Sequence, residues 1–230
     1  QQEQRQQHAE ALASLALART YAQQLTDAGE RLEAHCHLLA TQAALGEVIP
    51  AWRAAQASES PLARVKAFQE IAKALLELNQ WKAAVQSLRL ATPSLAAMRS
   101  GADYFECGMR QFSALLALGE FDLAPALMTD LLQQAAALPP GRHRLTLMRQ
   151  LARVQMSVTF AEFLIDKAGP RTILRQVLAD LPGNLPEAEQ RSFACALLLD
   201  FMRVADLEGA RLAGLPPLRA AKRISHISAI

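Results

Sequence analysis

The sequence contains few of the residues that favour β-strands. Valine, isoleucine and threonine are scarce, and no stretch alternates between apolar and polar residues for long enough to suggest a sheet. β-Branched side chains fit a pleated surface better than a helix. Alanine and leucine instead supply more than a third of the chain, and both lose little entropy in a helix. The composition therefore predicts an all-α protein.

Aromatic residues are also few, at 5% of the 230 residues. Helices must then pack through small faces, where alanine allows close approach and leucine fills the gaps. The chain also has no large excess of one charge, because it contains 24 basic and 22 acidic residues. This balance gives no electrostatic footprint for nucleic acid or an anionic membrane surface. No apolar run reaches the roughly 18 residues of a membrane span.

Cysteine occurs only at Cys36, Cys107 and Cys195, without CxxC or zinc spacing. His35 and His37 flank Cys36, but side chains two residues apart on a helix point about 200° apart, so they cannot share a metal ion. We expect one of these histidines to be partly buried and the other exposed. No GxSxG, HExxH, Walker or GxGxxG motif is present. The sequence therefore predicts no enzyme, no cofactor and no metal site.

The compartment is less clearly indicated. The separated cysteines fit a reducing environment, which favours a cytoplasmic location. The chain begins at Gln1 in the polar run QQEQRQQ, as expected of a processed product or a fragment. Export therefore stays open as an alternative if an upstream signal was removed. The sequence makes no prediction of the oligomeric state.

Turn and start signals divide the chain into helical segments. Ser60-Pro61 is a helix start, since serine caps free amides and proline suits the first helical position. Three further turns follow one pattern, in which leucine precedes a residue that tolerates a tight turn, a polar residue and a large apolar residue. Their turn residues, Gly46, Asn79 and Gly119, are 33 and 40 residues apart. Such periods are typical of helical repeats. A weaker echo occupies residues 205–210, and other expected breaks are Pro93, Gly101, Pro139-Pro140-Gly141, Gly169-Pro170, residues 181–186 and Pro216-Pro217.

The segment 65–92 has the most regular pattern of large and small apolar residues around its turn. With Asn79 at the turn, the pattern residues are Phe68, Ile71, Ala72, Trp81, Ala84, Leu88 and Ala91. In this register the segment resembles a tetratricopeptide repeat of about 34 residues. The units at 32–58 and 105–132 match less well: the first has His35 in place of an aromatic residue, and the first helix of the second departs from the pattern.

We therefore expect an α-solenoid of about five antiparallel helix pairs. One pair cannot hide its apolar face alone, and stacked neighbours bury a continuous core. Residues 1–138 would form tetratricopeptide-like repeats and residues 139–230 degenerate ones, in the same continuous solenoid. A C-terminal capping helix is expected around the basic cluster at Arg219, Lys222 and Arg223, with a basic tail as the alternative.

The resemblance implies a protein-interaction or scaffold module that binds a peptide or protein segment in a concave groove lined by the first helices of its repeats. The resemblance implies that Lys66, Gln69 and Lys73 contact the ligand. The alternative is that they are ordinary surface residues. A second candidate set is Arg142, Arg149 and Arg153, which fall within roughly 40° on one helical stripe. Such a stripe is either a solvated face or a site for carboxylate or phosphate. Either set suggests a partner with acidic groups.

A function of another class is also open. The chain could be a helical sensory or regulatory domain that binds a small molecule in an enclosed pocket between helices. Single-stranded nucleic acid is not favoured, because it needs a basic groove with stacking aromatics. We expect Trp52 and Trp81 to be used in packing instead.

Overall fold

The structure is a computed structural model that describes residues 2–98, 101–120, 122–159, 168–204 and 206–213. In these ranges the chain forms helices and no strand, which confirms the all-α prediction. Contacts divide the chain into two compact units, unit 1 (Gln1–Glu120) and unit 2 (Phe121–Ile230). The division expected at residue 138 therefore falls inside unit 2.

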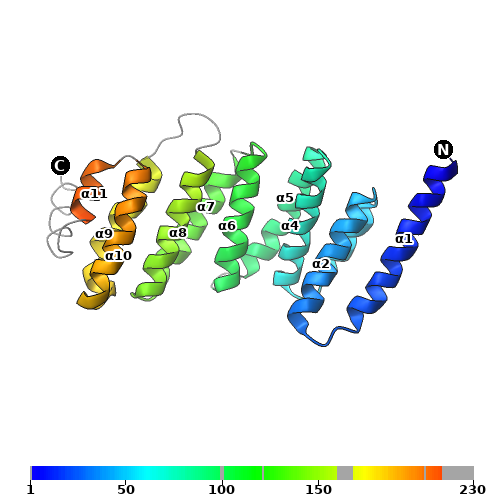
Figure 1. Cartoon of the computed structure of the whole chain (residues 1–230), viewed down its shortest axis with the longest axis horizontal. Helices are drawn as coiled ribbons and strands as arrows, with labels where there is room; N and C mark the ends of the chain where they lie inside the picture. The colour runs from blue at the N-terminus through cyan, green and yellow to red at the C-terminus, as the bar shows by residue number, and fades with distance from the viewer. Residues whose placement is uncertain (1, 99–100, 121, 160–167, 205, 214–230) are drawn as a thin grey trace. The chain divides into compact units, whose positions relative to one another are not determined.

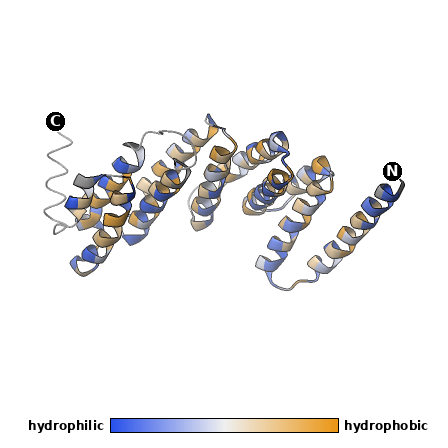
Figure 2. Cartoon of the chain, turned by 45° about the horizontal axis from the view of Figure 1, so that its top comes forward, coloured by the Kyte–Doolittle hydropathy of each residue, from blue (hydrophilic) through white to orange (hydrophobic). Residues whose placement is uncertain are grey.

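Unit 1 contains six described helices that pack mainly on their neighbours in sequence, as in an α-solenoid (Figure 1). The helix α2 contacts α1, α3 and α4, and α4 contacts α5 and α6 as well. Hydrophobic and hydrophilic residues both occur on these helices, as amphipathic packing requires (Figure 2). The helices are α1 (Gln2–Gln23), α2 (Ala28–Ala44), α3 (Val48–Gln56), α4 (Pro61–Glu77), α5 (Trp81–Ala97) and α6 (Ala102–Ala117).

Unit 2 repeats the same kind of packing in its described residues. The helix α8 contacts α7 and α9, and α9 also contacts α10 and α11, which pack on each other. The predicted capping helix around Arg219 lies outside the described residues. The helices of this unit are α7 (Leu123–Ala137), α8 (Arg142–Thr159), α9 (Ala168–Asn184), α10 (Glu187–Arg203) and α11 (Leu207–Ala213).

The three predicted turns have one geometry. Gly46, Asn79 and Gly119 all adopt a positive φ, at 92°, 58° and 74°. In each turn the next amide donates to the carbonyl five residues earlier, as from Gln80 to Leu75 at 2.8 Å. Together with the bond from the turn residue itself, this satisfies two of the free carbonyls at the end of a helix. The sequence pattern thus identified the ends of α2, α4 and α6.

Proline acts differently at its two most prominent positions. Ser60 caps α4 as predicted, since its Oγ accepts from the Ala63 amide at 3.1 Å and Pro61 is the first helical residue. Pro93 was expected to break a helix, and this expectation is wrong, because α5 continues through it to Ala97. Buried Ser94 and Leu95 lie just beyond it. Burial of these residues offsets the lost backbone hydrogen bond.

Small residues form the closest contacts of unit 1. Ala72, Ala84 and Ala91 are at most 1% exposed, and Phe68 and Leu88 fill the space around them. These burials follow the predicted register of residues 65–92. Trp81 departs from it, because its side chain is 53% exposed. As the first residue of α5 its Cβ tilts toward the N-terminal end of the helix and projects beyond it.

Candidate functional site

The first predicted ligand set lies on α4, and its members have different surroundings. Lys73 is exposed and Lys66 is half-buried. Gln69 is buried and its Nε2 donates to the backbone carbonyl of Cys107 on α6 at 2.8 Å. Gln69 therefore holds α4 against α6, which corrects the expectation that it faces an open groove. The sequence of an amphipathic helix does not show whether a polar residue faces water or a buried carbonyl.

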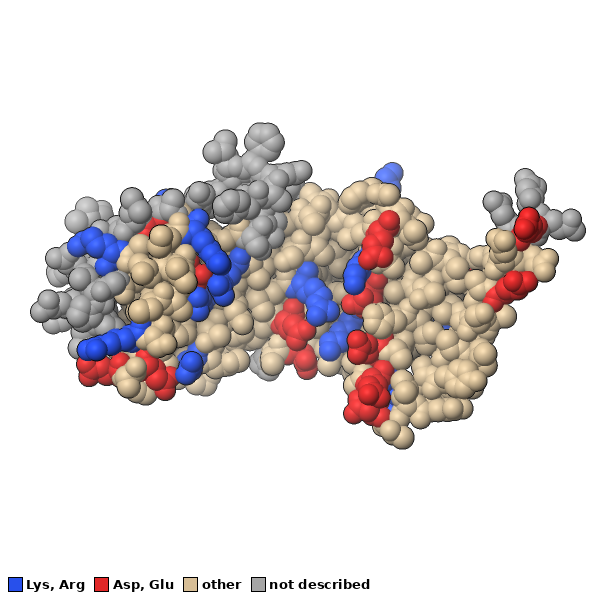
Figure 3. All heavy atoms as spheres, in the orientation of Figure 1, with Lys and Arg blue, Asp and Glu red and all other residues tan. Residues whose placement is uncertain are grey.

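The surface around these lysines carries both signs of charge. Arg110 on α6 lies 3.0 Å from Glu106 and 3.7 Å from Glu70 on α4. Figure 3 shows basic and acidic side chains next to each other over this part of unit 1. Lys66 and Lys73 form no ion pair with a described residue, but acidic side chains lie among the basic ones here, so this surface offers no clear preference for an acidic partner.

The second predicted set lies on α8, and the structure shows what two of its arginines bind. Arg149 and Arg153 both donate through Nε to the carboxylate of Asp200 on α10, Arg153 at 3.0 Å. Asp200 is completely buried, and Arg149 also donates to the Ala196 carbonyl at 2.9 Å. The anion recognised by these arginines thus belongs to the same unit.

Arg142 behaves differently from Arg149 and Arg153. Its Nη1 lies 3.0 Å from Glu189, but its side chain is 70% exposed. This is an ordinary surface ion pair with little energetic weight. The three arginines therefore share a stripe in sequence without forming one site in the folded chain. Sequence reasoning missed Asp200, whose only signal is an acidic residue after the apolar run Leu197–Leu199.

A second buried carboxylate in unit 2 repeats this arrangement. Both oxygens of Asp206 accept from Arg175 at 2.8 Å, and one accepts from the Gly209 amide at 3.0 Å. Burial alone would raise the pKa of Asp206. The hydrogen bonds from Arg175 and Gly209 and the charges of Arg175 and Arg171 outweigh this effect and lower the pKa. These arginine–aspartate contacts join α9 to the residues around the start of α11.

The His35-Cys36-His37 cluster has the expected disposition. His35 is half-buried with Nε2 3.2 Å from the Ser58 hydroxyl, and His37 is exposed. Burial raises the pKa of Cys36 and of Cys107 to about 11, so both thiols stay protonated near neutral pH. No group of three His, Cys, Asp or Glu side chains in the described residues is placed to hold a metal ion.

A groove of about 390 Å³ lies between α3, α4 and α5. Its floor includes the buried ring of Phe68, and Ile49 on its rim is 58% exposed. The indole Nε1 of Trp52 donates to the Ser87 hydroxyl at 2.8 Å, which fixes one wall. The lining residues are Ile49, Trp52, Arg53, Gln56, Phe68, Arg89, Leu90 and Pro93.

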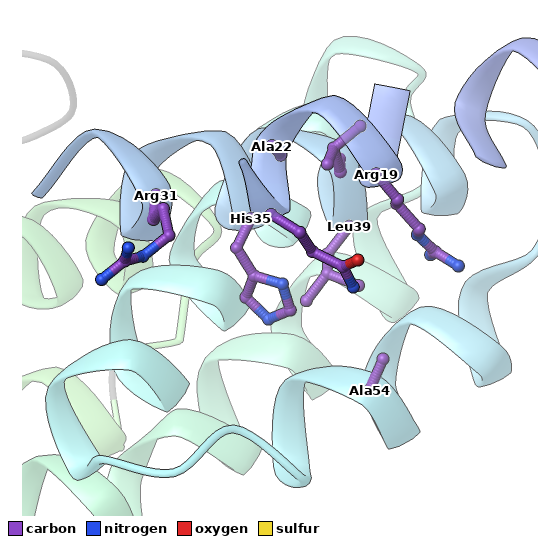
Figure 4. A pocket seen from close by; sticks show the side chains of 8 residues that line it. Arg19, Ala22, Arg31, His35, Leu39 and Ala54 are labelled. Carbon is purple, nitrogen blue, oxygen red and sulfur yellow. The ribbon is translucent and has the colours of Figure 1, made fainter. Parts of the chain in front are cut away.

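A cleft of about 430 Å³ lies between α1, α2 and α3. In Figure 4 the ring of His35 lies between Arg31 and Arg19, which come from α2 and α1. Burial and the charge of Arg19 lower the pKa of His35, which keeps its ring neutral at pH 7. The lining residues are Arg19, Ala22, Gln23, Arg31, His35, Leu38, Leu39 and Ala54.

Comparison with known proteins leaves the family unassigned. No family model matches the chain, and no curated protein matches its sequence. Among solved structures, the crystal structure of BtubC (BKLC) from P. vanneervenii is similar, at 16% identity and a TM-score of 0.47. The match covers 98% of this chain and 92% of that one. The tetratricopeptide resemblance therefore stays a prediction.

Among the described residues, no helix combines the length and the apolar character that a bilayer-spanning helix needs.

Proposed function

We propose that this chain is a non-catalytic interaction module that binds a segment of a partner protein in the groove between α3, α4 and α5. The observation that carries this proposal is the exposed apolar rim above a buried aromatic floor. Ile49 presents most of its side chain to solvent directly beside the groove, while Phe68 below it is completely buried. An apolar side chain of a partner would cover Ile49 and displace water from the groove.

The wall of the groove is held in place before any partner binds. Trp52 is fixed by its hydrogen bond to Ser87, whose own hydroxyl donates to the Ala83 carbonyl at 2.9 Å. A fixed indole loses little conformational entropy on binding, so more of the contact energy remains as affinity.

The charge of the groove indicates the chemistry of the partner segment. Arg53 is exposed and makes no ion pair with any described residue. Arg89 pairs with Glu120 at 2.8 Å, but its side chain is 52% exposed and the pair is a weak surface one. Among the described residues, neither Asp nor Glu lines the groove. A segment with a large apolar residue beside an acidic one therefore fits best.

The backbone of α5 adds a hydrogen-bond acceptor. Pro93 has no amide hydrogen, so the carbonyl of Arg89, four residues earlier, lacks its regular helical donor. Both residues line the groove. An N–H group of an extended partner segment could donate there, in addition to the apolar and ionic contacts.

We also propose that residues 65–92 form a tetratricopeptide-type unit. The burial of Phe68, Ala72, Ala84, Leu88 and Ala91 supports this register, and the exposure of Trp81 departs from it. The proposed groove differs from the one that the resemblance implies, because it involves the second helices α3 and α5 and not only the first helices.

Selection from a random 12-residue peptide display library would test the proposed function. Wild-type protein should enrich sequences that combine a large apolar residue with Asp or Glu. An Ile49→Glu variant should lose them, and Arg53→Glu should weaken a selected peptide about 10-fold or more.

Leu17→Glu serves as the matched control, because Leu17 is 57% exposed on α1 and does not line the groove. It should bind the selected peptides like wild type. No enrichment, or enrichment that survives both Ile49→Glu and Arg53→Glu, would contradict the proposal.

A further inference from the structure

The cleft between α1, α2 and α3 contains two arginines, Arg19 and Arg31, that have no acidic partner in the part of the chain that the structure describes. Arg19 donates to the side-chain oxygen of Gln42, and Arg31 donates through Nη1 to the backbone carbonyls of Leu25 and Thr26. Neither guanidinium forms an ion pair with a described residue, and no Asp or Glu of the described ranges lines the cleft. Since a guanidinium carries five N–H donors, both retain hydrogens for an additional acceptor.

The rest of the lining is mainly apolar. Ala22, Leu38, Leu39 and Ala54 come from three different helices and enclose the space beside the two arginines. The neutral ring of His35 lies between the arginines and adds no charge (Figure 4). The volume of about 430 Å³ lies within the range of small-molecule sites. The cleft therefore combines a positive end group with a surface for an apolar body.

We infer that this cleft binds a small amphipathic carboxylate, with the carboxylate held by Arg19 or Arg31 and the hydrocarbon body against Leu38, Leu39 and Ala54. The geometry of a carboxylate matches a guanidinium fork, and an apolar body would displace water from the walls. A fully hydrated polyanion would leave these apolar walls exposed to water. This site is separate from the peptide groove, since the two lining sets share no residue.

Decanoate is a suitable probe, at concentrations below micelle formation. The ring signals of His35 in proton–carbon NMR spectra should shift in a saturable manner as decanoate is added. His37 is the internal control, because it lies two residues along α2, is exposed and does not line the cleft. 1-Decanol has the same chain without the charge and should bind roughly 10-fold more weakly or worse.

Two variants test the arginines, and a third tests the walls. Arg19→Gln and Arg31→Gln are each expected to weaken decanoate binding, at least one of them by about 10-fold. Arg191→Gln, at an exposed position of α10 that lines neither cavity, should keep wild-type affinity. Ala54→Phe should block the cleft. Circular dichroism would show that each variant is folded.

Three results would overturn the inference: no saturable shift of His35, equal binding of decanoate and decanol, or wild-type affinity in Ala54→Phe and both cleft-arginine variants. Because Ile49→Glu leaves the cleft intact, it should still bind decanoate. A failure of the peptide selection and a failure of decanoate binding are therefore distinguishable.

Discussion

Units 1 and 2 bury polar side chains in different ways. In unit 1, Gln69 and Gln111 are neutral and donate to backbone carbonyls of a neighbouring helix. In unit 2, the buried groups include the carboxylates of Asp200 and Asp206, and these are the only charged side chains that are buried among the described residues. Each carboxylate is contacted by arginine.

The difference shows that one kind of helix packing can be stabilised by two kinds of polar contact. A neutral buried amide that donates through its N–H groups costs less than a buried carboxylate, which is tolerated only with compensating charge. The Oε1 atoms of Gln69 and Gln111 are buried and accept no hydrogen bond from a described residue. Unit 1 should therefore depend mainly on the fit of its small residues. Unit 2 should depend on ion pairs that join α8 to α10 and α9 to the region before α11.

The two units can be followed separately in the whole protein. Both tryptophans of the chain, Trp52 and Trp81, lie in unit 1, so their fluorescence reports unfolding of that unit. Far-ultraviolet circular dichroism reports the helices of both. The comparison can then be tested by variants of the 230-residue chain.

The largest effect is expected for Asp200→Ala. Removal of this buried carboxylate leaves Arg149 and Arg153 without their acidic partner and should cost about 3–5 kcal/mol of unfolding free energy. Urea unfolding followed by circular dichroism should show an early transition, while tryptophan fluorescence changes less. Arg191→Ala, an exposed position on the same helix, should change stability by under about 0.5 kcal/mol. If the two variants unfold at the same urea concentration, the ion pairs of Asp200 do not stabilise unit 2.

In unit 1 the largest effect should come from overpacking. Ala84 is completely buried, so Ala84→Leu should cost about 1–3 kcal/mol, measured by tryptophan fluorescence in urea. Gln86→Leu introduces the same side chain at an exposed position of α5 and serves as the control. If Ala84→Leu unfolds like wild type, the close helix contact at residue 84 is absent.

Gln111→Leu should reduce stability less than Asp200→Ala or Ala84→Leu. Its amide donates to the Leu88 carbonyl at 3.1 Å and to the Thr92 hydroxyl at 3.0 Å, and leucine has a similar volume. Loss of these neutral hydrogen bonds should cost about 1 kcal/mol by the same fluorescence measurement. A loss as large as that of Asp200→Ala would erase the distinction between the two units.

The pH dependence of unit 1 should include a modest contribution from His35. Its pKa is lowered in the folded state from the ordinary 6.5, so the unfolded chain binds the proton more readily. The contribution of His35 to the stability of unit 1 is complete above pH 6.5 and is lost as the pH falls through the folded-state pKa. The contribution of Asp206 to the stability of unit 2 begins to be lost only when the pH falls below 3.8, the ordinary pKa of an aspartate.

Fluorescence-detected unfolding at a series of pH values would check the contribution of His35. His35→Gln should reduce the decline of unit 1 stability below pH 6.5, and His37→Gln should retain it. If the stability of unit 1 declines as steeply in His35→Gln as in wild type, other titrating groups cause the decline.

The smallest effect is expected for Arg142→Ala. Its exposed pair with Glu189 should contribute less than about 0.5 kcal/mol and weaken further in salt. Arg149→Ala should cost several times more in the same circular dichroism experiment, because its partner is buried. If both variants lose the same stability, burial of the partner does not decide the strength of these pairs.

Local structure was the part that could be predicted from the sequence. The ends of α2, α4 and α6 depend on one residue each with a positive φ, and the leucine-turn-polar pattern identifies them. The cap at Ser60 is local in the same sense. Pro93 was mispredicted because packing of the residues beyond it outweighs its local preference.

Contacts between distant residues could not be predicted. Arg149 and Asp200 are 51 positions apart, and no pattern in the sequence joins them. The two cavities likewise depend on how neighbouring helices are spaced, which composition and periodicity do not specify. Of the six proposed ligand residues, none lines either cavity.

The nine-residue helix α3 is a common wall of the two cavities of unit 1. Ala54 faces the cleft, while Ile49, Trp52, Arg53 and Gln56 face the groove. Because residues on this one helix line both cavities, a displacement of α3 by a ligand in one of them would alter the dimensions of the other. A ligand in either cavity would then act on the other through this single helix of about two and a half turns and its tethers, His35 to Ser58 and Trp52 to Ser87.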